Sequence, residues 1–280
     1  MSEPWFCDPD DVSAALERAG YLPDDAIATT VFLADHLQRP LLLEGPAGVG
    51  KTALAAALAT ATGSSLIRLQ CYEGVDEARA LYEWNHAAQL LRITAAGDDS
   101  SVFTEEFLLP RPLLKAVRNP SRAVLLIDEL DKADEEMEGL LLELLSEFQV
   151  TIPELGTIKA KHTPLVILTS NAQRELSEAL RRRCLYLHLD YPTQDREREI
   201  VQLHAPGLPE ALTASVVRTV AALRDLDLRK APSISETVDW ARTLLALGAD
   251  DLDPALVERT LGVVLKHQTD IDTVRAAWLK

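Results

Sequence analysis

The segment from Gly45 to Thr52 has the residue types and the spacing that bind nucleotide phosphates. It matches GxxxxGK[ST] at every fixed position. Glycines let backbone N–H groups turn toward phosphate oxygens, and a helix that follows adds the positive end of its dipole. Lys51 would contact the β- and γ-phosphates, and Thr52 would ligate Mg²⁺. The predicted triphosphate-binding residues are Gly45, Pro46, Ala47, Gly48, Val49, Gly50, Lys51 and Thr52.

Two carboxylates follow the apolar run Val124–Ile127. Asp128 would complete the Mg²⁺ shell of a bound triphosphate. Glu129, directly after it, is placed to orient and polarise an attacking water, which a hydrolase requires and a nucleotide kinase does not. The alternative is that both residues merely open an acidic loop that also contains Asp131 and Asp134.

An amide side chain follows another apolar run. Asn171 comes shortly after Leu165–Thr169 and would hold the lytic water against the γ-phosphate. Asparagine is also a common turn residue, and the sequence leaves both interpretations open.

The basic triplet Arg181, Arg182 and Arg183 stands out in an acidic chain. One of these guanidinium groups could reach the γ-phosphate of an adjacent subunit and stabilise the charge of the transition state, as an arginine finger does. The alternative is a cationic last turn of the helix predicted around Leu176 to Leu180.

Short apolar runs alternate with segments long enough for helices, which predicts a parallel α/β sheet. One such segment, Lys51 to Ala61, is rich in Ala and Leu and predicts a helix that ends near Gly63. The predicted strands are Leu41–Leu43, Leu66–Leu69, Val124–Ile127, Leu165–Thr169 and Leu185–Leu189.

Three parts follow from this alternation. Residues 1–38 form an N-terminal helical arm, residues 39–192 an α/β nucleotide-binding domain, and residues 193–280 a small all-α domain, because only helical patterns follow Pro192. We therefore predict a P-loop nucleotide-binding fold: a parallel sheet flanked by helices, followed by a small all-α domain.

Composition excludes several function classes. The 280 residues carry a formal net charge of −16, so nucleic acid is not the expected partner. Three cysteines without a CxxC pair suit a reducing compartment. No apolar run is long enough to span a membrane, and the first residues lack the features of a signal peptide, so we expect a cytoplasmic protein.

The order of these motifs resembles the AAA+ ATPases along essentially the whole chain. Within them the sequence is similar to the MoxR family. Three stretches look like its CoxD-type subgroup, which is associated with maturation of carbon monoxide dehydrogenase and related molybdenum hydroxylases: Cys71–Ala78, Ala80–Asn85 and Leu176–Cys184.

This resemblance implies an ATPase that hydrolyses ATP with Mg²⁺ and assembles as a homo-oligomer, a hexameric ring. Arg183, with Arg182 as the alternative, would complete the nucleotide site of the neighbouring subunit. The implied partners are a von Willebrand factor A domain adaptor protein and a client metalloenzyme that is remodelled or loaded with its cofactor.

The resemblance also implies two insertions and shows one departure. One insertion would lie between about Glu73 and Thr94, and the other, a hairpin, around Val150 to His162. Many AAA+ lids carry a sensor 2 arginine at the start of a helix, but no arginine occupies the first helical turn after Pro232. Arg229, Lys230 and Arg242 are the substitutes that the sequence offers.

Three rival functions share the phosphate-binding loop. A nucleotide-dependent switch or scaffold with negligible turnover is disfavoured by Glu129 and Asn171. A small-molecule or nucleotide kinase fits poorly with the arginine triplet and the long helical C-terminal part. A DNA-remodelling AAA+ ATPase is disfavoured by the charge of −16. The absence of an NKxD motif favours ATP over GTP.

Overall fold

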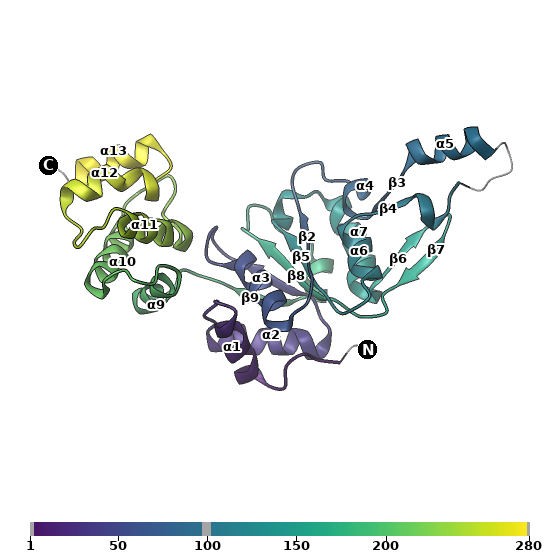
Figure 1. Ribbon diagram of the computed structural model, residues 1–280, viewed down its shortest axis with the longest axis horizontal. Helices are drawn as coiled ribbons and strands as arrows, with labels where there is room; N and C mark the ends of the chain where they lie inside the picture. Colours follow the sequence, from purple (N-terminus) through teal and green to yellow (C-terminus); the bar gives the residue numbers. More distant parts are fainter. Residues whose placement is uncertain (1–2, 97–101, 279–280) are drawn as a thin grey trace. The chain divides into compact units, whose positions relative to one another are not determined.

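A parallel sheet with the strand order β2-β5-β8-β1-β9 organises the first of two units (Figure 1). The computed structural model describes residues 3–96 and 102–278. The first unit comprises Met1–Gly45 and Lys51–His188, and the second comprises Pro46–Gly50 and Leu189–Lys280. The sheet strands are β1 (Leu41–Glu44), β2 (Leu66–Gln70), β5 (Val124–Asp128), β8 (Leu165–Ser170) and β9 (Leu185–His188).

Helices pack against this sheet, which explains its almost wholly apolar central strands. Side chains alternate between faces along a strand, so Leu125 and Ile127 share one face. Both belong to a core cluster that also contains residues of α6 (Pro112–Arg118) and α7 (Glu135–Glu147). Helix α3 (Lys51–Thr62) contacts β5 and β8. The predicted α/β fold with parallel strands is confirmed.

The strand register brings the predicted site residues to one edge of the sheet. Gln70 at the end of β2 pairs with Asp128 at the end of β5, and Glu44 at the end of β1 pairs with Ser170 at the end of β8. Ligands of open parallel sheets bind outside these carboxyl ends. The phosphate-binding loop and the residues that follow β5 and β8 therefore start from neighbouring points.

Two helices precede the sheet. They are α1 (Pro9–Arg18) and α2 (Asp25–Leu37), and Asp8 and Asp24 cap their first turns with side-chain hydrogen bonds. The pair is anchored by the fully buried Asp35, whose carboxylate lies 2.5 Å from the Arg122 guanidinium. Breaking a buried pair of this kind leaves an uncompensated charge, so the anchor ties the arm to the sheet.

Two small antiparallel pairs extend the first unit. The sequence around the first predicted insertion folds as α4 (Glu77–Ala80), β3 (Tyr82–Trp84) and α5 (His86–Ala96), followed by η1 (Glu105–Phe107) and β4 (Leu108–Pro110). Strands β3 and β4 pair, and α5 extends beyond them (Figure 1). The predicted hairpin is confirmed as β6 (Gln149–Ile152) and β7 (Gly156–Lys159).

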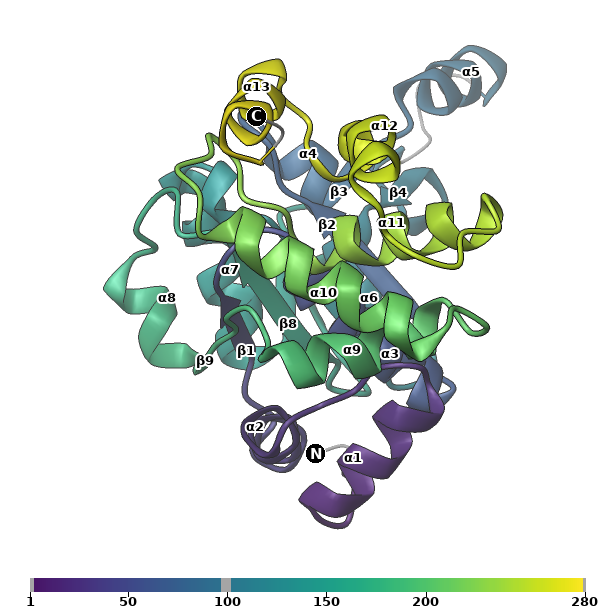
Figure 2. The same ribbon diagram turned by 90° about the vertical axis from the view of Figure 1, so that its left-hand side faces the viewer.

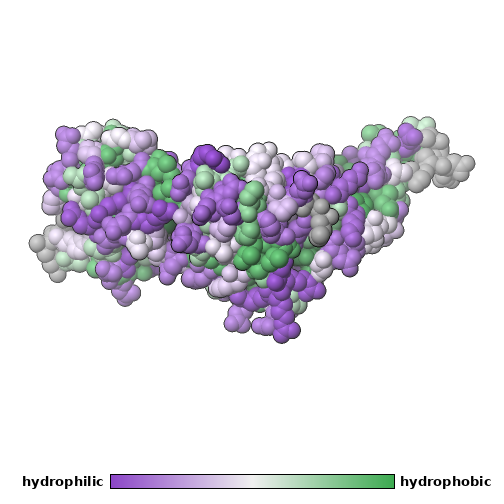
Figure 3. All heavy atoms as spheres, turned by 90° about the horizontal axis from the view of Figure 1, so that it is seen from below, coloured by the Kyte–Doolittle hydropathy of each residue, from purple (hydrophilic) through white to green (hydrophobic). Residues whose placement is uncertain are grey.

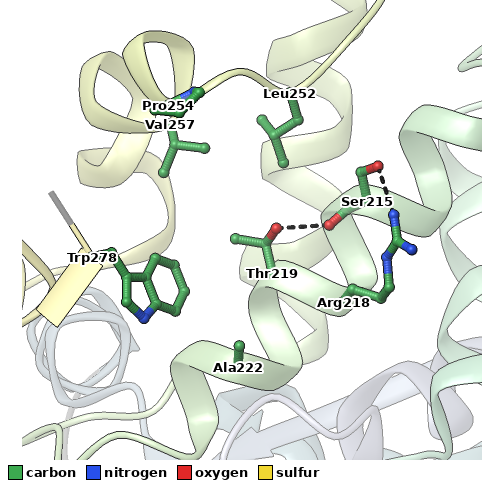
Figure 4. A pocket seen from close by; sticks show the side chains of 8 residues that line it. All are labelled: Ser215, Arg218, Thr219, Ala222, Leu252, Pro254, Val257 and Trp278. Carbon is green, nitrogen blue, oxygen red and sulfur yellow. Dashed lines mark hydrogen bonds between the residues drawn. The ribbon is translucent and has the colours of Figure 1, made fainter.

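The second unit contains five helices among its described residues: α9 (Gln194–His204), α10 (Glu210–Arg224), α11 (Ile234–Ala246), α12 (Pro254–Val264) and α13 (Gln268–Trp278). Helices α9 and α10 lie side by side (Figure 2). The fully buried Trp240 donates its indole N–H to Thr260 at 2.8 Å. Buried Glu197 accepts two hydrogen bonds from Arg224, at 2.6 and 2.8 Å. A cavity of about 430 Å³ opens between α10, α12 and the end of α13 (Figure 4).

The surface is of mixed polarity (Figure 3), and the thiols are unbridged. The face seen in Figure 3 is mainly hydrophilic and is interrupted by apolar areas. Burial raises the pKa of the Cys71 and Cys184 thiols to about 12, so both stay protonated near neutral pH. All three cysteines are unbridged. Within residues 3–96 and 102–278, every helix is too short or too polar to cross a lipid bilayer.

Candidate active site

Lys51 joins the phosphate-binding loop to the end of strand β8. It is the first residue of α3, and its side chain is almost completely buried. The ammonium group donates hydrogen bonds to the Gly45 carbonyl oxygen at 2.6 Å and to Asn171 Oδ1 at 2.9 Å. The structure therefore brings together two residues that the sequence places far apart but predicts for one site.

Burial and nearby carboxylates act on the charge of Lys51 in opposite directions. Burial lowers the pKa of its ammonium group, because desolvation disfavours the charged form. Asp131, Asp128 and Glu129 act in the opposite direction and favour the charge. A phosphate group beside the ammonium would add further stabilisation, since an opposite charge within a few ångströms raises a lysine pKa.

The loop itself adopts a backbone that only glycine tolerates well. Gly45, Gly48 and Gly50 have φ angles of 150°, 75° and 101°. A Cβ atom on Gly48 would also collide with the Cβ and Oγ atoms of Ser233, which belongs to the same unit. Glycine at position 48 is therefore required by conformation and by space.

Asp128 and Thr52 meet as the predicted magnesium pair. Asp128 is buried at the end of β5, and Thr52 donates to its Oδ1 at 3.0 Å. A hydroxyl and a carboxylate are the hard oxygen ligands that Mg²⁺ prefers, and this ion usually keeps several waters and takes its remaining ligands from substrate phosphates. The donor set fits Mg²⁺. Among the described residues, no group of three or more His, Cys, Asp or Glu side chains forms a metal site.

Glu129 is held in an uncommon conformation. Its φ and ψ angles of 56° and 48° lie in the left-handed region, which costs a non-glycine residue about 1–2 kcal/mol. Its carboxylate accepts hydrogen bonds from Gln70 Nε2 at 2.8 Å and from Lys132 Nζ at 2.7 Å. Strained residues persist only where the surroundings specify them, and they concentrate at active sites.

Asn171 is positioned through its backbone by Asp131. The buried carboxylate of Asp131 accepts hydrogen bonds from the Asn171 and Gln173 N–H groups, both at 3.1 Å. Between them, Ala172 has a φ angle of 58°. Asp134 has a different task, since its side chain caps α7 at the Met137 N–H. In the acidic loop that follows β5, Asp131 therefore positions a site residue, and Asp134 stabilises the start of helix α7.

The three arginines of helix α8 (Glu178–Arg183) have different surroundings. Arg181 forms an ion pair with Glu44 at 2.7 Å. Arg183 donates to Ser146 Oγ at 2.6 Å. The Arg182 side chain is 80% exposed and lies 3.4 Å from Glu178. Such an exposed ion pair is weak, so Arg182 would give up the least interaction energy of the three on binding elsewhere.

The candidate sensor 2 residues all have partners within the second unit. Arg242 donates to the His204 carbonyl oxygen at 3.0 Å, and Lys230 lies 3.4 Å from Glu236. The backbone N–H of Arg229 donates to Asp270 at 2.9 Å.

Four residues of the site were not predicted: Arg68, Gln70, Asp131 and Thr169. Arg68 lies in the predicted strand Leu66–Leu69, and Gln70 follows this strand directly. Residues two positions apart in a strand project from the same face, so the sequence could have indicated that these two polar side chains lie together. Thr169 gave no such signal. Its hydroxyl donates to Asp128 Oδ1 at 2.6 Å and accepts the Glu129 N–H at 2.8 Å.

Replacing Thr169 with valine is expected to lower the free energy of unfolding by about 1–3 kcal/mol, because it leaves the Glu129 N–H group without its partner. Urea unfolding followed by circular dichroism measures this change. Thr151→Val on the exposed face of strand β6 is the matched control, with an expected change within about 0.5 kcal/mol. Equal effects of the two substitutions would show that the Thr169 hydroxyl does not organise the site.

The comparisons with known proteins cover this same region. A family model described as AAA domain (dynein-related subfamily) matches residues 40–184, which is more than half of the chain. Protein NorQ of Paracoccus denitrificans is 26% identical over 254 residues, covering 87% of this chain and 87% of NorQ. Chaperone protein ClpB 2 of Parasynechococcus marenigrum is 37% identical over 133 residues, or 46% of this chain and 13% of ClpB 2.

A solved structure shares the fold. A point mutant of RuvB from Thermotoga maritima superimposes with a TM-score of 0.51 at 18% sequence identity, covering 92% of this chain and 71% of the RuvB chain. At this identity the likeness concerns the fold alone.

Proposed function

The chain belongs to the dynein-related subfamily of AAA domains and is an ATP-hydrolysing enzyme, and on that premise we propose that it is a MoxR-type ATPase that remodels or matures a client protein. One observation carries the proposal for the site. Lys51 contacts Asn171, Thr52 contacts Asp128, and Glu129 follows at the same edge of the sheet. This arrangement contains a group for each task of ATP hydrolysis.

The site residues would divide the reaction as follows. The loop N–H groups and Lys51 hold the triphosphate, and Thr52 and Asp128 hold Mg²⁺, which would neutralise charge on the phosphate oxygens. Glu129 accepts the hydrogen bond of the attacking water and polarises it toward the γ-phosphate. Asn171 orients the same water. Gln70 and Lys132 both donate to Oε2 of Glu129, so its Oε1 atom would accept the water while these contacts hold the carboxylate in place.

The resemblance to MoxR proteins extends this proposal to a hexameric ring in the cytoplasm. Each site would lie between two subunits, with Arg183 or Arg182 of the neighbour stabilising charge on the γ-phosphate. The exposure of Arg182 supports its candidacy. Arg183 would first have to give up its bond to Ser146.

The client is proposed by resemblance. The match to NorQ supports a MoxR-type protein, and the stretches Cys71–Ala78 and Leu176–Cys184 resemble the CoxD-type subgroup. We therefore propose a metalloenzyme client, a molybdenum hydroxylase such as carbon monoxide dehydrogenase, and a von Willebrand factor A domain adaptor. Helix α5, with Leu90 and Leu91 exposed, is a candidate contact for either partner.

The rival functions make different demands on the same site. A switch or scaffold without turnover would not need Glu129 beside the magnesium pair. A DNA-remodelling motor is disfavoured by the net charge of −16, because phosphate backbones are bound by clustered positive charge.

Capture of partners by a hydrolysis-deficient chain tests the client proposal. A tagged Glu129→Gln protein, loaded with ATP in its native host, is expected to retain a metalloenzyme and an adaptor in stoichiometric amounts. A Lys51→Ala protein, which should not bind ATP, is the control and should retain neither. Recovery of nucleic acid alone, or of a partner that contains neither a metal cofactor nor a von Willebrand factor A domain, would contradict the proposal.

A further inference from the structure

Arg68 places a positive charge on the carboxylate expected to help hold Mg²⁺. Its Nη2 atom lies 2.5 Å from Asp128 Oδ2. The other carboxylate oxygen of Asp128 accepts hydrogen bonds from Thr52 at 3.0 Å and Thr169 at 2.6 Å. The hydroxyls can remain where they are beside a metal ion, but a guanidinium on the same carboxylate repels a divalent cation that approaches it.

The position of Arg68 follows from the sheet. Strand β2 pairs with β5 in parallel, with Arg68 opposite Leu126 and Gln70 opposite Asp128. Arg68 and Gln70 lie two positions apart and project from the same face. The long arginine side chain therefore reaches along the strand to Asp128. Its side chain is 49% exposed, whereas that of Asp128 is 3% exposed, so the guanidinium can leave toward solvent and the carboxylate cannot.

We propose that Arg68 is a displaceable counterion of Asp128. It neutralises the buried carboxylate before the metal binds, and it leaves when Mg²⁺ enters with the nucleotide. This inference rests on the proposed nucleotide site. The physical reason is that a buried, unpaired carboxylate is costly, so a nearby cation stabilises the metal-free protein. The same contact must be broken for Mg²⁺ to bind, so it weakens the apparent affinity for the metal.

The departure of Arg68 would also change the surroundings of Glu129. The same Nη2 atom donates to Gln70 Oε1 at 2.5 Å, and Gln70 Nε2 donates to Glu129. Without Arg68, the Oε1 atom of Gln70 loses the hydrogen bond that holds the side-chain amide in place. Occupancy of the metal site is thereby linked to the freedom of the residue that polarises water.

Nucleotide binding measured with and without Mg²⁺ tests this role. The full chain is titrated with a fluorescent ADP analogue, once in excess EDTA and once across a series of Mg²⁺ concentrations. For Arg68→Ala, the Mg²⁺ concentration at half-saturation is expected to fall about 3- to 10-fold, because an ion pair whose guanidinium is half exposed to solvent contributes modestly. Affinity in EDTA is expected to fall, because Asp128 then repels the phosphates without compensation.

Two further variants keep the result interpretable. Arg118→Ala removes the same charge from a pair with Glu105 at 3.1 Å and should leave the Mg²⁺ dependence unchanged. Arg68→Gln keeps most of the side chain and should shift the dependence in the same direction as Arg68→Ala. An unchanged Mg²⁺ midpoint in a folded Arg68 variant would overturn the proposal. Failure of the unmodified chain to bind nucleotide under either condition would instead overturn the nucleotide site.

Discussion

Replacing Glu129 with glutamine is expected to preserve ATP binding and to reduce steady-state hydrolysis about 10²- to 10⁴-fold, the usual contribution of a general base. Glutamine keeps the length and shape of the side chain but cannot accept a proton from water. Phosphate release measures turnover, and a fluorescent ATP analogue measures binding. The two readouts separate loss of chemistry from loss of the nucleotide.

The matched control for this substitution is Glu135→Gln, an equivalent change in the exposed first turn of α7. It should leave both turnover and binding within about twofold of the unmodified chain, as expected for a surface change. If Glu129→Gln turned over ATP at the unmodified rate, Glu129 would not be the residue that activates water. A loss of binding would indicate that its charge organises the loop.

Mixing two inactive variants is expected to restore hydrolysis if the finger arginine acts across a subunit interface. Lys51→Ala should abolish binding at its own site, since the ammonium lies at the junction of Gly45 and Asn171. Arg183→Ala should disable the neighbouring site. In a ring with random order, about a quarter of the interfaces combine an intact loop with an intact arginine, so equal mixing should recover activity of that order.

The same mixture prepared with Arg182→Ala identifies the finger. Of Arg182→Ala and Arg183→Ala, the variant that lacks the finger should be inactive alone and should regain ATP hydrolysis when it is mixed with Lys51→Ala. Differently tagged subunits that copurify establish that the two variants assemble together. Absence of recovery in mixtures shown to assemble would mean that the arginines act within their own subunit, or outside the chemistry altogether.

The sequence alone predicted the parts of the site whose geometry is local. The run from Gly45 to Thr52 is covalently contiguous, so its glycine spacing determines the backbone without help from distant residues. The central strands were predictable because burial on both faces requires almost unbroken apolar runs, as in Val124–Ile127. Asp128 and Asn171 were predictable in turn, because parallel strands end at one edge of a sheet.

Side-chain direction and strand order were decided only by the tertiary structure. The apolar runs do not reveal that β2 lies beside β5, and therefore do not show that Arg68 reaches Asp128 or that Gln70 reaches Glu129. The left-handed backbone of Glu129 does not follow from its residue type, and its N–H group and carboxylate are held by residues of other elements. The arginines at 181 to 183 are chemically identical in sequence and differ only in which neighbours the fold supplies. Contacts between segments distant in sequence depend on the complete packing, and that packing determines the electrostatic surroundings of every charged group in the site.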